Sequence, residues 1–218
     1  MNGAQFSSAA YWESRYRSGG HSGAGSYGRL ADFKAAFINS FIAANRIASV
    51  LDLGCGDGNL LSLLRVPAYV GVDVAPSTLA ACTARFADRP GVRFLSYDRL
   101  EPAGTAELGL SIDVIYHLVE DTVFAGYMRA LFDHASRFVL VYASNVDLTW
   151  PAPHVRHRRF SDHVAQAHPQ WRLLAHVPNR YPFDPTRPEG TSFADFYLFG
   201  RGPGPCTLTV PEAADPVC

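Results

Sequence analysis

The sequence predicts an α/β domain with a doubly wound, largely parallel sheet that has an antiparallel end. Apolar β-rich runs and helix-compatible runs alternate from residue 49 to residue 144, which is typical of βαβ units. Right-handed crossovers between successive strands then place helices on both faces of the sheet. Two apolar runs near the C-terminus, 171–178 and 192–201, have no helix between them, and this predicts antiparallel strands.

The expected elements follow from the spacing of apolar residues and from the positions of glycine and proline. Residues 18–28 are polar and glycine-rich, which predicts a mobile loop after a short start around Tyr11–Tyr16. Apolar residues at three- and four-residue intervals then predict an amphipathic helix of about four turns, with one face made of Leu30, Phe33, Phe37, Phe41 and Ile42. β-rich runs predict strands at residues 49–54, 69–73, 92–98, 107–113, 137–144, 171–178 and 192–201. Helical runs predict helices at residues 59–65, 76–86, 114–135 and 160–168.

Length, composition and charge limit the classes of protein to which this chain can belong. The chain has 218 residues, 48% of them apolar, which suits one domain with a full core. The formal net charge of −1 argues against a protein that neutralises many phosphates, so no nucleic-acid partner is expected. Lys34 is the only lysine among scattered arginines. We expect an arm and lid loop at residues 1–29, the main domain at 30–202 and a disordered tail at 203–218.

The expected compartment follows from cysteine usage and from the apolar runs. The four cysteines have neither a CxxC nor a metal-type spacing, so we expect no disulfide framework and no metal site. The first residues lack the pattern of a signal peptide, and the longest apolar runs are too short to cross a bilayer. The sequence therefore predicts a cytoplasmic protein with no membrane partner.

The most informative stretch joins the first expected strand to the next helix. Asp52, near the end of this strand, is followed by three alternate glycines, Gly54, Gly56 and Gly58. Glycine permits positive φ and a close approach of a ligand to the backbone, and the N–H groups at the helix start suit a polar or anionic group. Nineteen residues beyond Gly54, Asp73 ends the second strand and is placed to accept hydrogen bonds from ribose hydroxyls. Together these features predict an adenosine-type ligand at the carboxyl ends of the first two strands.

The spacing of the loop narrows the choice of ligand. A dinucleotide site favours G-x-G-x-x-G, whereas the third slot of that pattern is Asn59 here, and no G-K-[ST] phosphate loop occurs. Asp52 and Asp57 would repel a pyrophosphate but suit a ligand that carries an ammonium group. A purely structural glycine turn is the alternative interpretation.

The glycine loop and the segment after it resemble motifs of a known family. The loop, LDLGCGDGNL, resembles motif I of class I S-adenosylmethionine-dependent methyltransferases, and the next run, YVGVDVAPSTLAAC, resembles their ribose-binding motif. A bacterial subgroup of small methyltransferases is similar to the later runs ELGLSIDVIYHLVED, VRHRRF and TSFADFY. The resemblance covers residues 30–200. It implies a Rossmann-like, doubly wound sheet of seven strands, mostly parallel with an antiparallel C-terminal hairpin, and S-adenosylmethionine as the cofactor.

The resemblance also implies roles for individual positions. The loop glycines would line the methionine side and Asp73 would hold the ribose. Asp98, beside Tyr97, would face the adenine amino group, with a turn cap after the strand as the alternative. The residues expected to bind the cofactor are Asp52, Gly54, Cys55, Gly56, Asp57, Gly58, Asp73, Val74, Tyr97, Asp98, Ser111, Ile112, Tyr27 and Arg29.

The acceptor side of the site is expected where the fourth strand ends. In an open α/β sheet the crevice lies beyond the carboxyl ends of the strands, which places Asp113 over it. His117 follows four residues later, so in a helix the two side chains share a face. An imidazole titrates near neutrality, and we therefore predict that His117 is the general base, with Asp113 beside it in the acceptor pocket. Packing or capping within the helix is the alternative for His117.

Two further segments allow more than one interpretation. Trp12, Tyr16 or Tyr27 of the N-terminal arm are candidates to stack near a sulfonium cation, with surface aromatics on a flexible arm as the alternative. Four histidines and three arginines between residues 154 and 168 are candidates for an acceptor-recognition lip. There, arginines would pair with a substrate carboxylate or phosphate. A solvated loop and a metal site are the alternatives.

The sequence thus predicts methyl transfer from S-adenosylmethionine to a hydroxyl or amine of a small molecule, such as a sugar or a natural-product intermediate. We infer this acceptor class because no nucleic-acid module and no N-P-P-Y or D-P-P-Y tetrad for a flipped base occurs in the sequence. A nucleotide- or S-adenosylmethionine-binding protein without catalysis and an NAD-dependent oxidoreductase are the alternatives. We expect a monomer or a homodimer.

Overall fold

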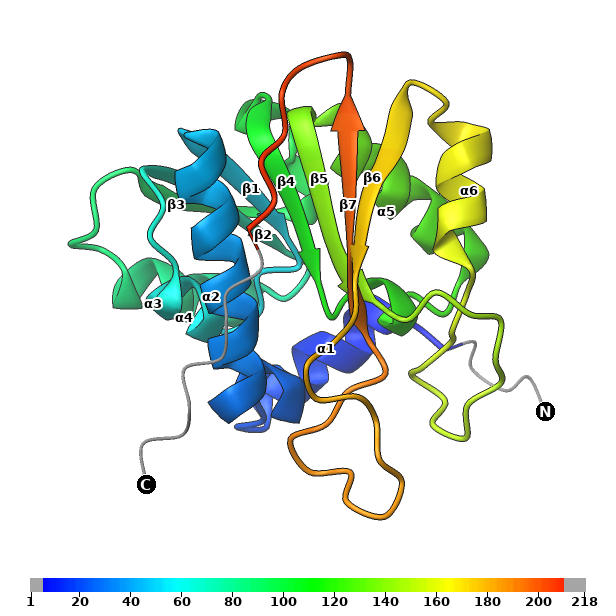
Figure 1. Cartoon of the computed structure of the whole chain (residues 1–218). Helices are drawn as coiled ribbons and strands as arrows, with labels where there is room; N and C mark the ends of the chain where they lie inside the picture. The colour runs from blue at the N-terminus through cyan, green and yellow to red at the C-terminus, as the bar shows by residue number, and fades with distance from the viewer. Residues whose placement is uncertain (1–5, 210–218) are drawn as a thin grey trace, which may run out of the picture.

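Seven strands form one twisted sheet in the computed structural model, which describes residues 6–209 (Figure 1). The strands are β1 (Ser49–Leu53), β2 (Ala68–Asp73), β3 (Val92–Ser96), β4 (Ala106–Ile112), β5 (Ala135–Ala143), β6 (Trp171–Val177) and β7 (Asp195–Arg201). Their spatial order is β3-β2-β1-β4-β5-β7-β6. The pairs from β3 to β5 are parallel, whereas β7 runs antiparallel to both β5 and β6. The predicted fold class is confirmed, including its antiparallel end.

Helices cover both faces of the sheet. They are α1 (Ser8–Arg17), α2 (Gly28–Asn45), α3 (Asn59–Leu63), α4 (Pro76–Arg85), α5 (Asp121–Asp133) and α6 (Phe160–Ala167). One core layer packs α2 and α3 against strand residues such as Val50 and Leu110. The other packs α5 and α6 against residues such as Leu51 and Val141. Neighbouring residues divide between the two layers because successive side chains of a strand point to opposite faces.

The N-terminal segment forms a helix, α1, where the sequence predicted only a short start around Tyr11–Tyr16. The Ser7 side chain caps the helix by accepting a hydrogen bond from the Ala10 amide at 3.3 Å. Figure 1 shows α1 at the end of the sheet to which β4 points, where the parallel strands finish. Ligands bind at this edge in open α/β sheets, so α1 lies over the expected site.

The prediction of one helix over residues 114–135 is wrong in its first two turns. A short 3-10 turn, η4 (Ile115–His117), comes first, and α5 begins only after an extended bend. The carbonyl oxygens of Leu118 and Val119 accept hydrogen bonds from the Arg158 guanidinium at 2.6 and 2.8 Å. A contact from a distant part of the chain therefore replaces the hydrogen bonds that a helix would have made.

The segment after β7 lies along α2. Residues 203–209 have no regular secondary structure, but the backbone of Thr207 makes two hydrogen bonds to the side chain of Asn45, at 2.7 and 2.9 Å. The remainder of the predicted tail, residues 210–218, lies outside the described residues, as does the start of the predicted arm. Within residues 6–209, no helix has both the length and the apolar character needed to cross a membrane.

Candidate active site

Three glycines shape the backbone between β1 and α3 at the floor of a cavity. Gly54, Gly56 and Gly58 have φ values of +88°, +57° and +73°. A side chain at Gly54 would clash with Val114, and one at Gly56 would clash with the hydroxyl of Ser22. Both the conformation and the lack of space therefore require glycine at these positions.

The cavity has a volume of about 320 Å³ and lies at the carboxyl ends of β1, β2 and β4. This is near the lower end of the range of about 300–1,000 Å³ found for small-molecule sites. Among the residues predicted from the sequence, the following line it: Asp52, Gly54, Cys55, Gly56, Asp57, Asp73, Val74, Tyr97, Ile112, Asp113 and His117. Two of the three aromatic candidates of the N-terminal arm, Trp12 and Tyr16, also line it, as do Ser22, Lys34, Glu120 and Tyr127.

Two buried carboxylates lie on the β1–β2 side of the cavity. Asp73 accepts hydrogen bonds from the amides of Gly56 and Ala75, both at 3.0 Å, and burial raises its pKa although these amides oppose the effect. Asp52 accepts a hydrogen bond from the Tyr69 hydroxyl at 2.7 Å. Its other oxygen, Oδ1, has no partner among residues 6–209, and burial raises the pKa of Asp52 to about 6. Because an unpaired buried oxygen is costly, a donor brought by a ligand would stabilise Asp52.

Residues 6–27, which we call the roof, cover the cavity. The Ser22 amide donates to the Asp57 carboxylate at 2.9 Å, and the Asp57 amide donates to the Ser22 hydroxyl at 3.0 Å. The Tyr27 hydroxyl reaches the same carboxylate at 2.7 Å. Burial by itself would raise the pKa of Asp57, but these hydrogen bonds lower it. The glycine loop and the roof are thus joined at one charged side chain.

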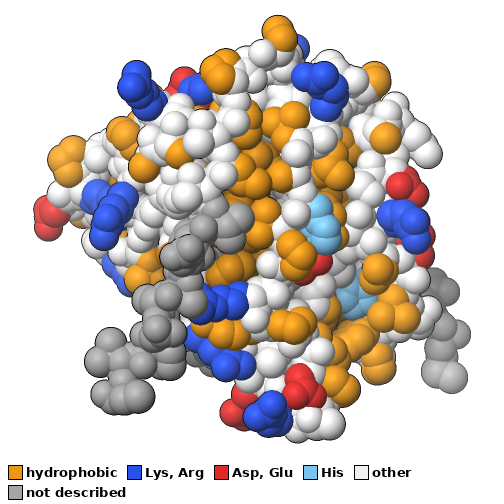
Figure 2. Space-filling model, in the orientation of Figure 1, with side chains coloured by type: hydrophobic (Ala, Val, Ile, Leu, Met, Phe, Trp, Pro, Cys, Tyr) orange, Lys and Arg blue, Asp and Glu red, His pale blue; other side chains and the backbone are white. Residues whose placement is uncertain are grey.

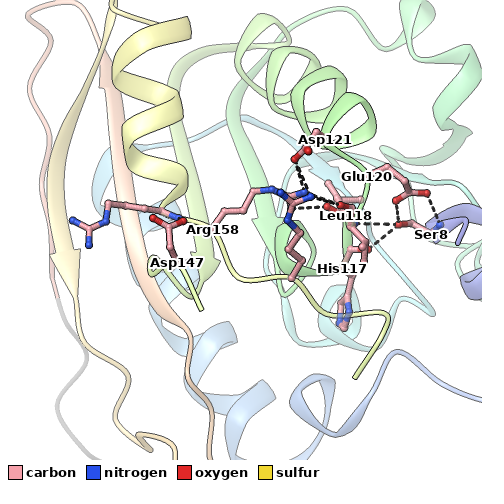
Figure 3. A network of polar contacts seen from close by, with 10 residues as sticks. Ser8, His117, Leu118, Glu120, Asp121, Asp147 and Arg158 are labelled. Atoms are coloured by element: carbon pink, nitrogen blue, oxygen red, sulfur yellow. Dashed lines mark hydrogen bonds and ion pairs between the residues drawn. The ribbon is translucent and has the colours of Figure 1, made fainter. Parts of the chain in front are cut away.

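The roof is also held at its N-terminal end. The Ser77 hydroxyl of α4 donates to the Glu13 carboxylate at 2.9 Å. The Ser8 amide donates to Glu120 at 2.8 Å, and the Ser8 hydroxyl also contacts Glu120 and lies 2.9 Å from the carbonyl oxygen of His117 (Figure 3). These contacts fasten α1 to the segment that follows β4.

A buried ion pair forms the part of the cavity wall at the end of β4, beside the glycine loop. Lys34 of α2, whose side chain is 2% exposed, pairs with the carboxylate of Asp113, and the Tyr116 hydroxyl donates to the other carboxylate oxygen at 2.8 Å. These contacts hold Asp113 at a φ of +61°, which is uncommon for a residue with a side chain. Sequence reasoning missed Lys34. Its position was the available signal, because the only lysine falls on the apolar face of α2 between Leu30 and Phe37.

His117 lies between the roof and the segment after β5. Its Nδ1 is 3.0 Å from the carbonyl oxygen of His154, and its ring contacts Trp12 edge-on with 4.9 Å between centroids. A carbonyl oxygen only accepts, so Nδ1 carries the proton and Nε2 keeps a lone pair. Burial lowers the pKa of His117 to about 4. The expected titration near neutrality is therefore wrong, and the ring is neutral at physiological pH.

Two arginines after β5 bind the protein itself. Arg158 donates to the carbonyl oxygen of Leu118 and to Asp121, as Figure 3 shows, and also to the carbonyl oxygen of Val119. Arg156 donates to Val119 and also pairs with Asp121, both at 3.0 Å. These arginines are used to build the cavity wall, so they do not support the predicted pairing with a substrate carboxylate or phosphate. Within residues 6–209, no cluster of three or more histidine, cysteine or acidic side chains is arranged to hold a metal.

Five of the predicted cofactor residues do not line the cavity. Arg29 turns toward the loop between β6 and β7, where its Nε donates to the carbonyl oxygen of Gly190 at 2.8 Å. Asp98 is exposed, and its carboxylate is contacted by the hydroxyl of Ser96, a contact between two side chains that caps no backbone group. The other three, which lie next to lining residues, are Gly58, Ser111 and Tyr27.

Comparisons with known proteins agree on one family. A family model described as a methyltransferase domain matches residues 27–185. The mouse protein EEF1A lysine methyltransferase 4 is 27% identical over 189 residues, which cover 78% of this chain and 69% of that protein. The magnesium protoporphyrin IX methyltransferase ChlM from Synechocystis PCC 6803, solved with S-adenosylhomocysteine, gives a TM-score of 0.63 at 13% identity, covering 89% of this chain and 98% of that one. The N-methyltransferase NodS from Bradyrhizobium japonicum WM9 gives 0.61 at 15% identity, covering 79% and 87%.

Proposed function

Because this chain belongs to the methyltransferase-domain family and is an S-adenosylmethionine-dependent methyltransferase, we propose that it methylates a hydroxyl or amine of a small molecule. A sugar or a natural-product intermediate is the acceptor class we favour. His117 and Asp113 are the residues we place on the acceptor side, and the glycine loop and Asp73 are those we place on the cofactor side.

The residues of the cavity fit the cofactor. The unpartnered Oδ1 of Asp52 suits the ammonium group of the methionine part. Each oxygen of the Asp73 carboxylate accepts one amide hydrogen bond and keeps a lone pair for a ribose hydroxyl. Gly54 and Gly56 have no side chain to block access to the backbone. When bound, S-adenosylmethionine supplies a sulfonium methyl group that a nucleophile can displace.

The roof is the observation that carries the proposal of a small acceptor. Residues 6–27 are hydrogen-bonded to the glycine loop, to α4 and to the segment after β4. A cavity of about 320 Å³ beneath such a cover suits a small molecule better than a residue on the surface of a folded protein. The cover also excludes water, which favours transfer to the acceptor over transfer to solvent.

The cavity wall at the end of β4 has groups that can accept the proton of a methyl acceptor. The neutral ring of His117 has a lone pair on Nε2. Burial lowers its pKa to about 4, so the ring is unprotonated across the neutral range but is a weaker base than an exposed imidazole. It would take the proton of an acceptor hydroxyl as the methyl group is transferred. The carboxylate of Asp113, which favours the charged form of His117, would stabilise the ring once it holds that proton.

The curated relative favours a second candidate, the methylation of a lysine in a protein. EEF1A lysine methyltransferase 4 is named for such a substrate, and its match extends over 78% of this chain. A lysine ammonium would also be compatible with the carboxylates of the cavity, among them Asp113 and Glu120. For this candidate the roof would have to open at the acceptor end.

Labelling with tritiated S-adenosylmethionine separates the two candidates. The enzyme is incubated with a cell extract that has been divided by ultrafiltration into small molecules and proteins, and each fraction is counted. We expect label in the small-molecule fraction, and its loss with the Asp73→Asn variant. Label in the protein fraction alone would reject the small acceptor in favour of a protein.

A further inference from the structure

We propose that Lys34 binds the carboxylate in the methionine part of S-adenosylmethionine, and that the cavity thereby distinguishes this cofactor from nucleosides that lack a carboxylate. The inference rests on the placement of the cofactor given with the proposed function. It adds the residue that recognises the end of the amino acid, and it does not depend on the identity of the methyl acceptor.

The ammonium group of Lys34 reaches the cavity beside the glycine loop. Its Nζ is bonded to the carboxylate of Asp113, and both residues line the cavity. The residue after Asp113, Val114, lies so close to Gly54 that a Cβ at Gly54 would be 2.5 Å from its side chain. Because β1 and β4 are neighbours in the sheet, their ends bring the ion pair next to the backbone of the glycine loop.

This ammonium group has hydrogen-bond donors to spare. A lysine ammonium carries three N–H donors, and Asp113 supplies the only acceptor bonded to Nζ within residues 6–209. The ring of Tyr142, whose centroid is 5.2 Å from Nζ, favours the positive charge but is not a strong acceptor. The side chain of Lys34 is buried, so the missing acceptors have to come from the cavity.

Lys34 is also the single cationic side chain that lines the cavity in the described part of the chain. Figure 2 shows basic side chains spread over the outer surface of one face of the molecule, and no arginine is among the lining residues. His117 is neutral, because burial lowers its pKa to about 4. The acidic lining residues, by contrast, are Asp52, Asp57, Asp73, Asp113 and Glu120. A ligand carboxylate is therefore repelled by much of this lining and attracted by Lys34.

The glycine loop leaves no backbone donor for that carboxylate. Every amide from Gly54 to Asn59 donates to an acceptor of the protein itself. Taken in chain order, these acceptors are the carbonyl oxygen of Val72 for the first two amides, the carboxylate of Asp73, the hydroxyl of Ser22, the carbonyl oxygen of Cys55 and the carboxylate of Asp57. An anion bound by the loop would have to replace one of these hydrogen bonds, whereas Lys34 has donors available.

Lys34 and Asp52 together match an amino acid in its doubly charged form. Oδ1 of Asp52 lacks a donor, and Nζ of Lys34 lacks acceptors. Burial raises the pKa of Asp52, and Lys34 is close enough for its charge to oppose this effect. An α-ammonium group and an α-carboxylate would satisfy both side chains. Because the two ligand charges cancel, they bring no net charge into the cavity.

Calorimetric titration with two nucleosides tests the inference without an acceptor and without turnover. S-adenosylhomocysteine has both charged groups of the amino acid. Decarboxylated S-adenosylhomocysteine keeps the nucleoside, the sulfur and the ammonium group but has no carboxylate. We expect the natural chain to bind S-adenosylhomocysteine at least about tenfold more tightly, since a hydrogen bond between charged groups is lost with the carboxylate. Equal affinities for the two nucleosides would overturn the inference.

Two variants of the ion pair separate a contact with the carboxylate from a role in shaping the wall. Lys34→Met combined with Asp113→Asn removes the cation together with its partner, so neither charge is left buried alone. In this variant the preference for S-adenosylhomocysteine should fall below about threefold. Asp113→Asn by itself keeps Lys34 and removes a competing anion, so the preference should be at least as large as in the natural chain. An equal loss of preference in both variants, each shown to be folded by circular dichroism, would mean that Lys34 only shapes the wall.

Arg85 provides the control for a cation that lies near the glycine loop but outside the cavity. Its guanidinium donates to the carbonyl oxygen of Asp57 at 3.3 Å, and it is not among the lining residues. Arg85→Gln should change the preference by less than about twofold, because the effect of an exposed charge is screened by solvent. A loss as large as in the paired variant would indicate general attraction of the carboxylate and would reject a contact with Lys34.

Failure of the proposed function would give a different result. If neither nucleoside binds, the placement of the cofactor is wrong, whereas equal binding of both rejects the role of Lys34 alone. Tritium label found only in the protein fraction would change the class of acceptor and leave the two affinities as they are.

Discussion

Substitution of Gly56 by alanine should destabilise the protein more than the backbone conformation alone explains. Gly56 has a φ of +57°, and any side chain there costs about 1–2 kcal/mol. The new Cβ would also displace the Ser22 hydroxyl, which is hydrogen-bonded to the Asp57 amide and to the Tyr16 hydroxyl, both at 3.0 Å. Two lost hydrogen bonds add about 2 kcal/mol. We therefore expect Gly56→Ala to lower the free energy of unfolding by about 3–4 kcal/mol.

Gly28 provides the control for this prediction. Its φ of +54° is nearly the same, but a Cβ at Gly28 would have no atom within 4 Å. Gly28→Ala should therefore cost only the conformational part, about 1–2 kcal/mol. Urea unfolding followed by circular dichroism measures both variants. In a Ser22→Gly background, where the nearest hydroxyl is absent, the cost of Gly56→Ala should fall toward the value of the control, with the Tyr16 hydroxyl 3.2 Å from the added Cβ as the remaining close contact. Equal costs for the two alanine variants in the natural background would refute the contact between the roof and the glycine loop.

Three further predictions concern charged groups of the cavity. Asp73→Asn should weaken binding of S-adenosylhomocysteine at least about tenfold, because charged hydrogen bonds are lost, whereas Asp98→Asn should change it by less than about threefold in the same calorimetric titration. Lys34→Met, which leaves Asp113 buried without its cation, should cost about 3 kcal/mol of unfolding free energy. Lys34→Met combined with Asp113→Asn, a neutral residue that tolerates the φ of +61° at this position, should recover most of it; an unchanged loss would argue against the pair. The pKa of His117 is lowered to about 4 from its usual 6.5, so the folded state disfavours the protonated ring and stability falls as the pH drops from 6.5 toward 4. Urea titrations should show about 2 kcal/mol of this loss at pH 5, and His117→Gln should lose less than the natural chain over the same range.

The sequence predicted well those elements whose structure depends on residues that lie close together in the chain. Continuous apolar runs such as 137–144 form strands because both faces of a parallel sheet are covered. The spacing of glycine and acid between Gly54 and Asp73 predicted that both lie at one site, and both line the cavity, since a strand, a tight turn and a helix start are adjacent in the chain. The two successive C-terminal strands likewise indicated the antiparallel end.

The predictions that failed depend on contacts between distant segments. The helix expected from residue 114 is interrupted because Arg158, some 40 positions later, donates hydrogen bonds to the carbonyl oxygens of Leu118 and Val119. Arg29 was expected at the cofactor but binds Gly190, and the sequence contains no sign of that loop's position. The pKa of His117 is low because the folded chain buries the ring, and burial depends on segments that precede and follow it by many residues.

The amino-acid order alone therefore determined the sheet, its antiparallel end and the glycine loop, because hydrophobic periodicity and glycine conformation act within a few residues. The tertiary structure decided which groups meet across the cavity: Lys34 with Asp113, Ser22 with Asp57, and His117 with the loop after β5. The physical reason is that a buried charge or an unpaired polar atom must find a partner wherever the packed chain supplies one. That partner is set by the packing of whole elements, which no local pattern encodes.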